Sequence, residues 1–315
     1  MVETAHDSHV PRALAQTRQF IERKLEPWPE FQAGLVVGSF AHGEARVDSD
    51  VDCIFLFDHP DERIVPAEFV WSPTTDTYST IFEVDALAVG GIQIDARRMS
   101  VAQFCSSEWE DGFKHELASA IVLFDRERTI APLLAQRLQY PDSLRLKRIR
   151  EHFFEADRCS QEWQVRAWVR RGGPLCAHEQ LAVAMEEIIA LLHAYNRTWL
   201  PWRCRRLIST LKLQWLPDGF AESVPAILCG VAPSEESVAR RWQRTVDLLK
   251  TIADQLQAEG LLTNVSDAFA TAHTALGYAH NMGAWEQAHR ELMLERGSSV
   301  APRGGEQGEV DQALA

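Results

Sequence analysis

Apolar residues in the first 130 positions occur in strand-length runs that turn-forming residues separate. Before these runs, a helix is predicted over residues 11–25, with Ser8 as its N-cap and Pro27 as its end. The pattern then predicts strands around 34–40, 51–58, 79–89 and 92–98, a helix over about 101–118, and a last strand at 120–124. Residues 1–130 are therefore expected to form an α+β domain, a small mixed β-sheet with helices on one side.

From Ala131 onward the apolar residues recur at helical spacing instead. Helices are predicted at 133–138, 143–168, 177–195, 203–213, 234–259, 267–278 and 283–295, with breaks at 172–174, Pro201, 217–219 and Pro233. Residues 131–296 are therefore expected to form an all-α helical bundle domain. The tail at 297–315 is rich in Gly, Glu and Ser, and it is expected to be flexible.

Length and composition fit an ordinary soluble enzyme. The chain has 315 residues, 46% of them hydrophobic, which is enough for two domains and a substantial core. We see no long apolar run and no signal-peptide pattern, so we expect a cytoplasmic protein without a membrane segment. The 6 cysteines lack the spacing of a zinc site or a disulfide framework, and they are expected to be reduced thiols.

The candidate chemistry lies in the segment 38–52. A Gly-Ser pair, Gly38 and Ser39, follows one predicted strand, and Asp50 and Asp52 open the next. Because side chains alternate along a strand, both aspartates are expected on the same face. Two neighbouring carboxylates repel each other unless a cation lies between them, and hard divalent ions such as Mg²⁺ prefer oxygen ligands. The pair therefore predicts a magnesium site.

The Gly-Ser pair is expected to bind phosphate. Gly38 has no Cβ, so an anion can approach the backbone, and Ser39 offers a hydroxyl beside the N–H groups of the following turn. Together with the aspartates, this turn predicts a site for a metal-bound triphosphate. The alternative is that Asp48, Ser49 and Asp50 only form a polar turn, but this explains neither Asp52 nor the Gly-Ser spacing.

The segment 34–58 closely resembles the signature of polymerase-β-like nucleotidyltransferases. The matching positions are Gly38, Ser39, Ala41, Gly43, Ala45, Asp48, Ser49, Asp50 and Asp52. The resemblance implies a palm-like nucleotidyltransferase domain at 1–130, with Mg²⁺ as cofactor and a nucleoside triphosphate, expected to be ATP, as co-substrate. It also implies a third carboxylate on a neighbouring strand.

Asp95 is our choice for this third carboxylate, because it lies in the apolar segment 92–96. That segment follows the apolar run 81–89, and the Gly90-Gly91 pair between them predicts a hairpin turn. Asp85 and Glu83 are the alternatives, although both suit the solvent face of a hairpin.

One position departs from the family pattern. Many relatives carry a basic residue directly after Gly-Ser, where this chain has Phe40. Arg46 is expected to contact the triphosphate instead, or a more distant base does so, among Arg97, Arg98, Lys147 and Arg148.

The net charge of −13 disfavours a nucleic-acid partner, since such proteins usually carry a basic stripe. Two local basic clusters exist, at 145–150 and 203–206. They are interpreted as solvated helix faces or contacts to the triphosphate, with an RNA end as the alternative.

The stretch 186–202 is similar, over a short length, to the helical domains of bacterial nucleotidyltransferases that include those acting on aminoglycosides. Tyr195, Trp199 and Trp202 could line a substrate pocket with His193 or Asn196, or they could simply pack in the core. At most one of the adjacent Glu186 and Glu187 can face a cleft.

The leading hypothesis is a magnesium-dependent enzyme that transfers an adenylyl group from ATP to a hydroxyl of a small molecule such as an aminoglycoside-like antibiotic, releasing pyrophosphate. Asp50, Asp52 and Asp95 would be the catalytic metal ligands, and Gly38, Ser39 and Arg46 would bind the nucleotide. The alternatives are an enzyme that modifies a protein or an RNA end, as antitoxin-like relatives imply, and a nucleotide-binding regulator without turnover. The sequence leaves the oligomeric state open.

Overall fold

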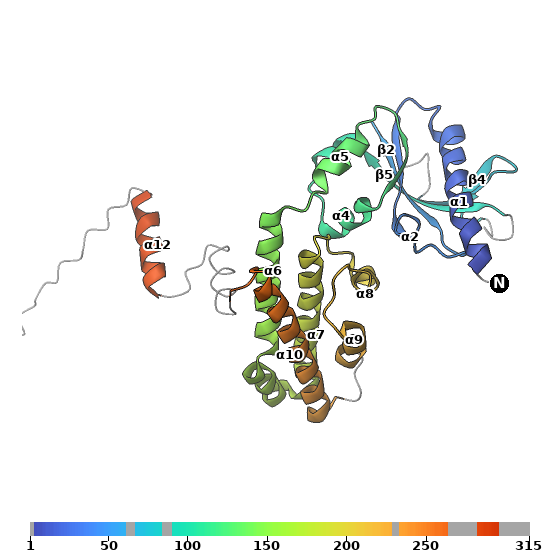
Figure 1. The fold of residues 1–315 in the computed structure, drawn as a ribbon. Helices are drawn as coiled ribbons and strands as arrows, with labels where there is room; N and C mark the ends of the chain where they lie inside the picture. Colours follow the sequence, from blue (N-terminus) through green and yellow to red (C-terminus); the bar gives the residue numbers. More distant parts are fainter. Residues whose placement is uncertain (1–2, 61–66, 84–89, 229–232, 264–281, 296–315) are drawn as a thin grey trace, which may run out of the picture. The chain divides into compact units, whose positions relative to one another are not determined.

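The computed structural model describes residues 3–60, 67–83, 90–228, 233–263 and 282–295 (Figure 1). Its contacts divide the chain into two compact units. Unit 1 comprises residues 1–145 and 189–221, and unit 2 comprises residues 146–188 and 222–315. This division by contacts differs from the sequence division at 130, which stays a prediction.

Unit 1 contains a mixed sheet of six strands in the order β4-β3-β5-β2-β1-β6. The strands are β1 (Phe31–Val36), β2 (Val51–Phe57), β3 (Glu68–Ser72), β4 (Thr77–Thr80), β5 (Ile92–Ser100) and β6 (Ile121–Asp125). Only the β2–β5 pair is parallel, while the other four pairs are antiparallel. The predicted α+β class with a mixed sheet is confirmed.

Helices cover both faces of this sheet, so the expectation of helices on one side is wrong (Figure 1). The central strands β1 and β2 are apolar on both faces, as their nearly continuous burial shows. Two exposed apolar faces would be costly in water, so each face needs a cover.

One face packs against α1 (Glu3–Phe20) and its π-helical continuation η1 (Ile21–Leu25). Phe20 is 1% exposed and contacts the rings of Phe55, Phe69 and Trp71. Ser8 lies inside α1 and is not its N-cap, because the helix begins eight residues before Pro11 and continues through it. Loss of one backbone hydrogen bond at a proline bends a helix without always ending it.

The other face packs against α3 (Val101–Ser106), α4 (Asp111–Ala118) and α5 (Ile130–Arg137). The single helix predicted over 101–118 is two helices, because Ser107 and Glu110 are extended. The intervening Trp109 is 2% exposed, and its indole N–H donates to the Phe104 carbonyl. The side chain of Ser100 caps α3.

Two strand predictions need correction. The sheet's hairpin is β3–β4, whereas residues 81–83 form a turn and 84–89 lie outside the described residues. The apolar core of β3 is only Phe69 to Trp71, too short to stand out in the sequence. The strand expected over 34–40 ends at Val36, and the short helix α2 (Gly38–Ala41) follows, because Gly38 turns the chain with a φ of +63°.

Unit 1 also contains the end of α7 (Glu162–Tyr195), the 3-10 helix η2 (Arg203–Arg205) and α8 (Arg206–Thr210). The backbone N–H of Trp215 donates to Asn196 Oδ1 at 2.8 Å, and Asn196 Nδ2 donates to the Trp215 carbonyl at 3.0 Å. His193 pairs with the hydroxyls of Thr198 and Thr210. These bonds fix the segment 196–215 to the end of α7.

Unit 2 is helical, as predicted. It contains most of α6 (Asp142–Ser160), of α7 and of α9 (Phe220–Leu228), together with α10 (Glu235–Ala258) and α12 (Met282–Glu295). The predicted helix 143–168 is interrupted between Ser160 and Glu162, α9 was not predicted, and the predicted helix 267–278 and the tail 297–315 lie outside the described residues. The expected break at 172–174 is present as a non-helical Gly173 inside α7.

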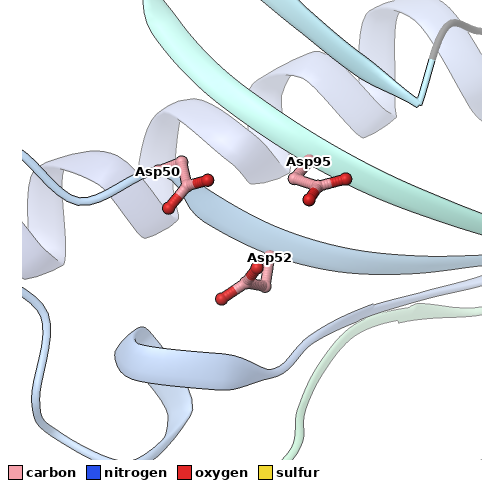
Figure 2. A group of neighbouring side chains, drawn as sticks. All are labelled: Asp50, Asp52 and Asp95. Carbon is pink, nitrogen blue, oxygen red and sulfur yellow. The ribbon is translucent and has the colours of Figure 1, made fainter. Parts of the chain in front are cut away.

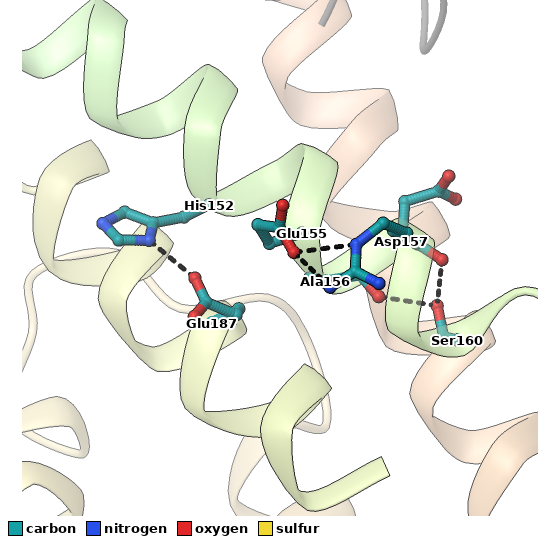
Figure 3. A network of polar contacts seen from close by, with 7 residues as sticks. His152, Glu155, Ala156, Asp157, Ser160 and Glu187 are labelled. Carbon is teal, nitrogen blue, oxygen red and sulfur yellow. Dashed lines mark hydrogen bonds and ion pairs between the residues drawn. The ribbon is translucent and has the colours of Figure 1, made fainter. Parts of the chain in front are cut away.

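Polar contacts join α6 and α7 within unit 2 (Figure 3). His152 Nδ1 lies 2.7 Å from Glu187 Oε2, so Glu187 pairs with a neighbouring helix. A second buried network links α7 to α10: Arg241 donates to His178 Nδ1, and His178 Nε2 lies 2.9 Å from the Ser237 hydroxyl. Burial and the charge of Arg241 lower the pKa of His178, so this imidazole is a neutral acceptor.

Among the described residues, no helix combines the length and the apolar character needed to cross a membrane. The described cysteines are free, in agreement with the expectation of reduced thiols. Cys229 lies outside the described residues.

Candidate active site

Three aspartates meet on one face of the sheet in unit 1, at the start of the central strand β2 (Figure 2). Asp52 lies in β2, Asp50 directly precedes that strand, and Asp95 lies in the neighbouring parallel strand β5. One carboxylate oxygen from each lies within 4.8 Å of the others. The structure therefore brings together the three carboxylates that the sequence placed in the metal site.

The alternation of side chains along the strands explains this arrangement. Val51 and Cys53 point into the core beneath α1, so Asp52 between them points to the opposite face. Ile94 and Ala96 also point into this core, so Asp95 between them points to the same face as Asp52. The parallel register pairs Asp52 with Asp95, which brings residues more than forty positions apart side by side.

Gly38 is required for the position of Asp52. A Cβ on Gly38 would lie 1.9 Å from Asp52 Oδ2, so only glycine leaves room for this carboxylate. The φ of +63° at Gly38 also favours glycine. The sequence had suggested that Gly38 makes room for phosphate, and the structure shows that Gly38 makes room for the Asp52 carboxylate.

Backbone N–H groups at the Gly-Ser turn donate hydrogen bonds to both the main chain and the side chain of Asp52. The N–H of Val37 donates to the Asp52 carbonyl at 2.9 Å, and the N–H of Ser39 donates to its carboxylate. Arg46 is 80% exposed, and its Nε lies 3.3 Å from Asp48. The assignment of Ser39 and Arg46 to the triphosphate stays a prediction.

The aspartates are electrostatically strained without a cation. Burial, together with the charges of Asp50 and Asp95, raises the pKa of Asp52 to about 6, even though Arg205 opposes the shift. Burial, followed by the charges of Glu68 and Asp50, also raises the pKa of Asp95. Carboxylates that repel one another at this distance are suited to share a hard divalent cation.

Two further acids lie near the aspartates, and neither was anticipated from the sequence. Glu68 pairs with Asp95 across the β3–β5 ladder. Glu116 in α4 has a raised pKa because of burial and the charge of Asp52, while its hydrogen bond to Trp202 acts in the opposite direction. Nothing in the spacing of α4 distinguishes Glu116 from an ordinary surface acid, because its proximity to Asp52 arises from packing.

Of the two alternative third carboxylates, Glu83 does not join the group. Glu83 accepts a hydrogen bond from the backbone of Thr80 in the turn after β4, and Asp85 lies outside the described residues. Among the distant bases, Arg97 stacks over the ring of Phe113 at 5.0 Å, and Lys147 and Arg148 belong to unit 2.

The aromatic residues around 195–202 act mainly in packing. Tyr195 is 8% and Trp199 5% exposed, and the Trp199 indole N–H donates to the Leu138 carbonyl. A Cβ on Gly112 would collide with the ring of Trp202. His193 and Asn196 bond to neighbouring protein groups, so core packing is the interpretation that the geometry favours over a substrate wall.

Two family models match consecutive parts of this chain. Residues 18–111 match the model described as a nucleotidyltransferase domain. This chain carries a nucleotidyltransferase domain. The domain contains Gly38, Ser39 and all three aspartates, and the predicted nucleotidyltransferase enzyme is confirmed at this level. Residues 113–204 match a second model, described as a domain of unknown function (DUF4037).

A crystal structure titled as a nucleotidyltransferase-like protein, from Exiguobacterium sibiricum 255-15, is 12% identical to the chain. The similarity covers 89% of this chain and 92% of that one, with a TM-score of 0.39. No curated protein matches the chain.

The nucleotidyltransferase domain indicates general nucleotidyl transfer, and its family generally uses a nucleoside triphosphate and a divalent metal. The three carboxylates fit such a metal by their donor chemistry, their proximity and their mutual repulsion.

Proposed function

We propose that this protein is a Mg²⁺-dependent enzyme that transfers an adenylyl group from ATP to a hydroxyl of a small-molecule acceptor. The observation that carries the proposal is the group of Asp50, Asp52 and Asp95, with carboxylate oxygens within 4.8 Å of one another, inside a nucleotidyltransferase domain. Gly38 keeps this group open toward the Gly-Ser turn, where the triphosphate binds.

In the proposed reaction, the acceptor oxygen attacks the α-phosphorus of ATP and forms a new P–O bond. The bond from that phosphorus to the β-phosphate oxygen breaks, and pyrophosphate leaves. Asp50, Asp52 and Asp95 would hold the metal, and the Asp95 carboxylate accepts the proton of the attacking hydroxyl. When bound, Mg²⁺ would supply positive charge for the phosphate and acceptor oxygens.

The acceptor is proposed to be a small polyol or an amine-rich molecule such as an aminoglycoside-like antibiotic. The net charge of −13 supports a cationic acceptor, because the field of the whole protein attracts positive ligands. The same charge disfavours an RNA end, and a protein acceptor or a regulator without turnover are the remaining alternatives.

The central experiment measures pyrophosphate release from ATP with Mg²⁺ and a panel of acceptors. Asp50→Asn and Asp52→Asn are expected to lower the rate at least about 100-fold, because they remove carboxylates that hold the metal. Asp58→Asn is the matched control, since this exposed aspartate at the end of β2 pairs with Gln32, and its variant is expected to keep the wild-type rate. Equal rates in wild type, Asp50→Asn and Asp52→Asn would reject the proposed site.

A screen with labelled ATP separates the acceptor classes. Label on a member of an antibiotic or metabolite panel supports the small-molecule proposal. Label only on a tRNA end or on a co-expressed protein would replace it with the macromolecular alternative. ATP binding without pyrophosphate release for every acceptor would favour the regulator.

A further inference from the structure

The Gly-Ser turn of this protein has no cation of its own. The next residue, Phe40, is 3% exposed and packs in the core beneath α1. Arg46, the nearest arginine in sequence, is 80% exposed and points to Asp48. A triphosphate carries several negative charges, so cations from elsewhere in the fold are needed near the turn.

Two cations from a distant part of the sequence converge on one carboxylate beside this turn. Arg205 Nη1 lies 3.2 Å from Glu44 Oε2, and Lys212 Nζ lies 2.6 Å from Glu44 Oε1. The Glu44 side chain is 17% exposed, and its backbone N–H donates to the Ser39 carbonyl at 2.8 Å. All of these residues belong to unit 1.

The charge of Arg205 also acts on Asp52. It counteracts the rise in the pKa of Asp52 and of Glu116. Although burial raises the pKa of Glu44, the bond to Lys212 and the two cations bring this pKa below its usual value. Glu44 is therefore an anion held between two cations beside the Gly-Ser turn.

The segment that carries the two cations is anchored. The paired bonds between Asn196 and Trp215 join its two ends, and the Trp199 indole N–H donates to the Leu138 carbonyl. Thr210 lies between Arg205 and Lys212 in the chain, is 0% exposed, and bonds to His193. Such anchoring lowers the entropy cost of holding a ligand.

We propose that Arg205 and Lys212 bind the terminal phosphates of the triphosphate, with Glu44 as the carboxylate that holds both cations in place until the phosphates replace it. This inference rests on the proposed function. The N–H groups of an arginine and a lysine that donate hydrogen bonds to a carboxylate can also donate them to a phosphate. The arginine guanidinium can bind a carboxylate or a phosphate through two parallel hydrogen bonds. The cations thus come from residues beyond both family matches, which end at residues 111 and 204.

The test measures the binding of α,β-methylene-ATP with Mg²⁺ by calorimetry, with adenosine as the ligand that lacks phosphates. Arg205→Met and Lys212→Met are expected to weaken binding of the analogue about 10-fold or more and to leave adenosine binding unchanged. Arg203→Met is the matched control, because Arg203 is exposed in the same 3-10 helix and its loss removes the same charge. Glu44→Gln is expected to keep or increase the affinity, because it frees the two cations.

The results separate this inference from the proposed function. Wild-type affinity in Arg205→Met and Lys212→Met, with lost Mg²⁺-dependent binding in Asp52→Asn, would overturn only the inference. Unchanged binding in all three variants, or no binding by the wild type, would overturn both. Weaker binding in Glu44→Gln would overturn the exchange of Glu44 for phosphate. Lys212 is 54% exposed, so its variant tests the idea even if Arg205→Met fails to fold.

Discussion

Gly38 and Asp52 depend on each other at the level of single atoms. Asp52 needs the space that a Cβ at position 38 would fill, and the backbone of the Gly-Ser turn donates hydrogen bonds to Asp52. The glycine that the sequence linked to phosphate thus also fixes the geometry of the carboxylates.

Gly38→Ala is therefore expected to lower pyrophosphate release about 100-fold, because a displacement of one ångström in a catalytic group has effects of this size. It is also expected to destabilise the protein by about 2 kcal/mol through backbone strain and the clash. Gly43→Ala is the control: Gly43 has a φ of +68° but nothing within 4 Å of its Cβ position, so it tests the backbone strain alone. Equal activity loss in both variants would show that the clash with Asp52 is unimportant.

The pKa of Asp52 predicts an unusual pH dependence of stability. Its value of about 6 in the folded protein exceeds the ordinary 3.8, so ionisation of Asp52 opposes folding. This penalty develops as the pH rises from about 4 through 6 and is complete above 6. Without divalent ions at pH 7.5, Asp52→Asn is expected to melt about 2 °C above the wild type, corresponding to about 1 kcal/mol after allowance for partial exposure.

Thermal unfolding in the presence of a chelator checks this prediction. At pH 4 the two proteins are expected to melt together, since the wild-type Asp52 is then protonated. With saturating Mg²⁺ at pH 7.5 the wild type is expected to gain more stability than the variant. If the variant melts below the wild type at pH 7.5 without metal, repulsion between Asp52 and the neighbouring carboxylates does not destabilise the folded protein, and the prediction is wrong.

At the scale of elements, the residues of the candidate site come together because particular strands and segments lie next to each other. β5 returns parallel to β2 and brings Asp95 to Asp52. The segment 196–215 is attached to the end of α7, and it carries Arg205 and Lys212. Helical periodicity predicted only that helices occur in this region, since it carries no information about such contacts.

Asn196→Ala is expected to loosen the segment 196–215. It removes both bonds to Trp215, so we expect a loss of about 1–3 kcal/mol and faster hydrogen exchange at the Trp215 amide. Asn196→Asp keeps the acceptor for that amide and is expected to preserve its protection in part. Unchanged exchange in Asn196→Ala would mean that other contacts hold this segment.

At the scale of the whole molecule, the three aspartates and the helical core belong to different units. Asp50, Asp52 and Asp95 all lie in unit 1, whereas Leu181, 0% exposed in α7, packs in the core of unit 2. Stability and metal binding are therefore expected to respond differently to substitutions.

Leu181→Ala is expected to destabilise the protein by about 2–5 kcal/mol through the cavity that it leaves. The Mg²⁺ dissociation constant measured by calorimetry at low temperature is expected to stay at the wild-type value. Leu175→Ala, at a 69% exposed position of the same helix, is the control and is expected to change stability by less than about 0.5 kcal/mol. A large change in Mg²⁺ affinity in Leu181→Ala would show that the two units are coupled.

The positions of Asp50, Asp52 and Asp95 could be predicted from local sequence patterns. The alternation of side chains along β2 places Asp50 and Asp52 together, and the apolar setting of Asp95 marks it as a strand residue. The strand β3 and the division of 101–118 into α3 and α4 were missed, because a short apolar run and an extended break around Trp109 leave little periodic signal.

The sequence by itself determined the class of the fold, through strand and helix periodicity, and the shared face of Asp50 and Asp52, through the alternation of side chains along one strand. The resemblance of the segment 34–58 to polymerase-β-like nucleotidyltransferases implied the third carboxylate and the nucleotidyl-transfer chemistry. Only the tertiary structure decided that helices cover both faces of the sheet, that Glu116 approaches Asp52, and that Arg205 and Lys212 meet at Glu44. Contacts between residues 161 and 168 positions apart depend on how the elements pack, and no local pattern encodes them.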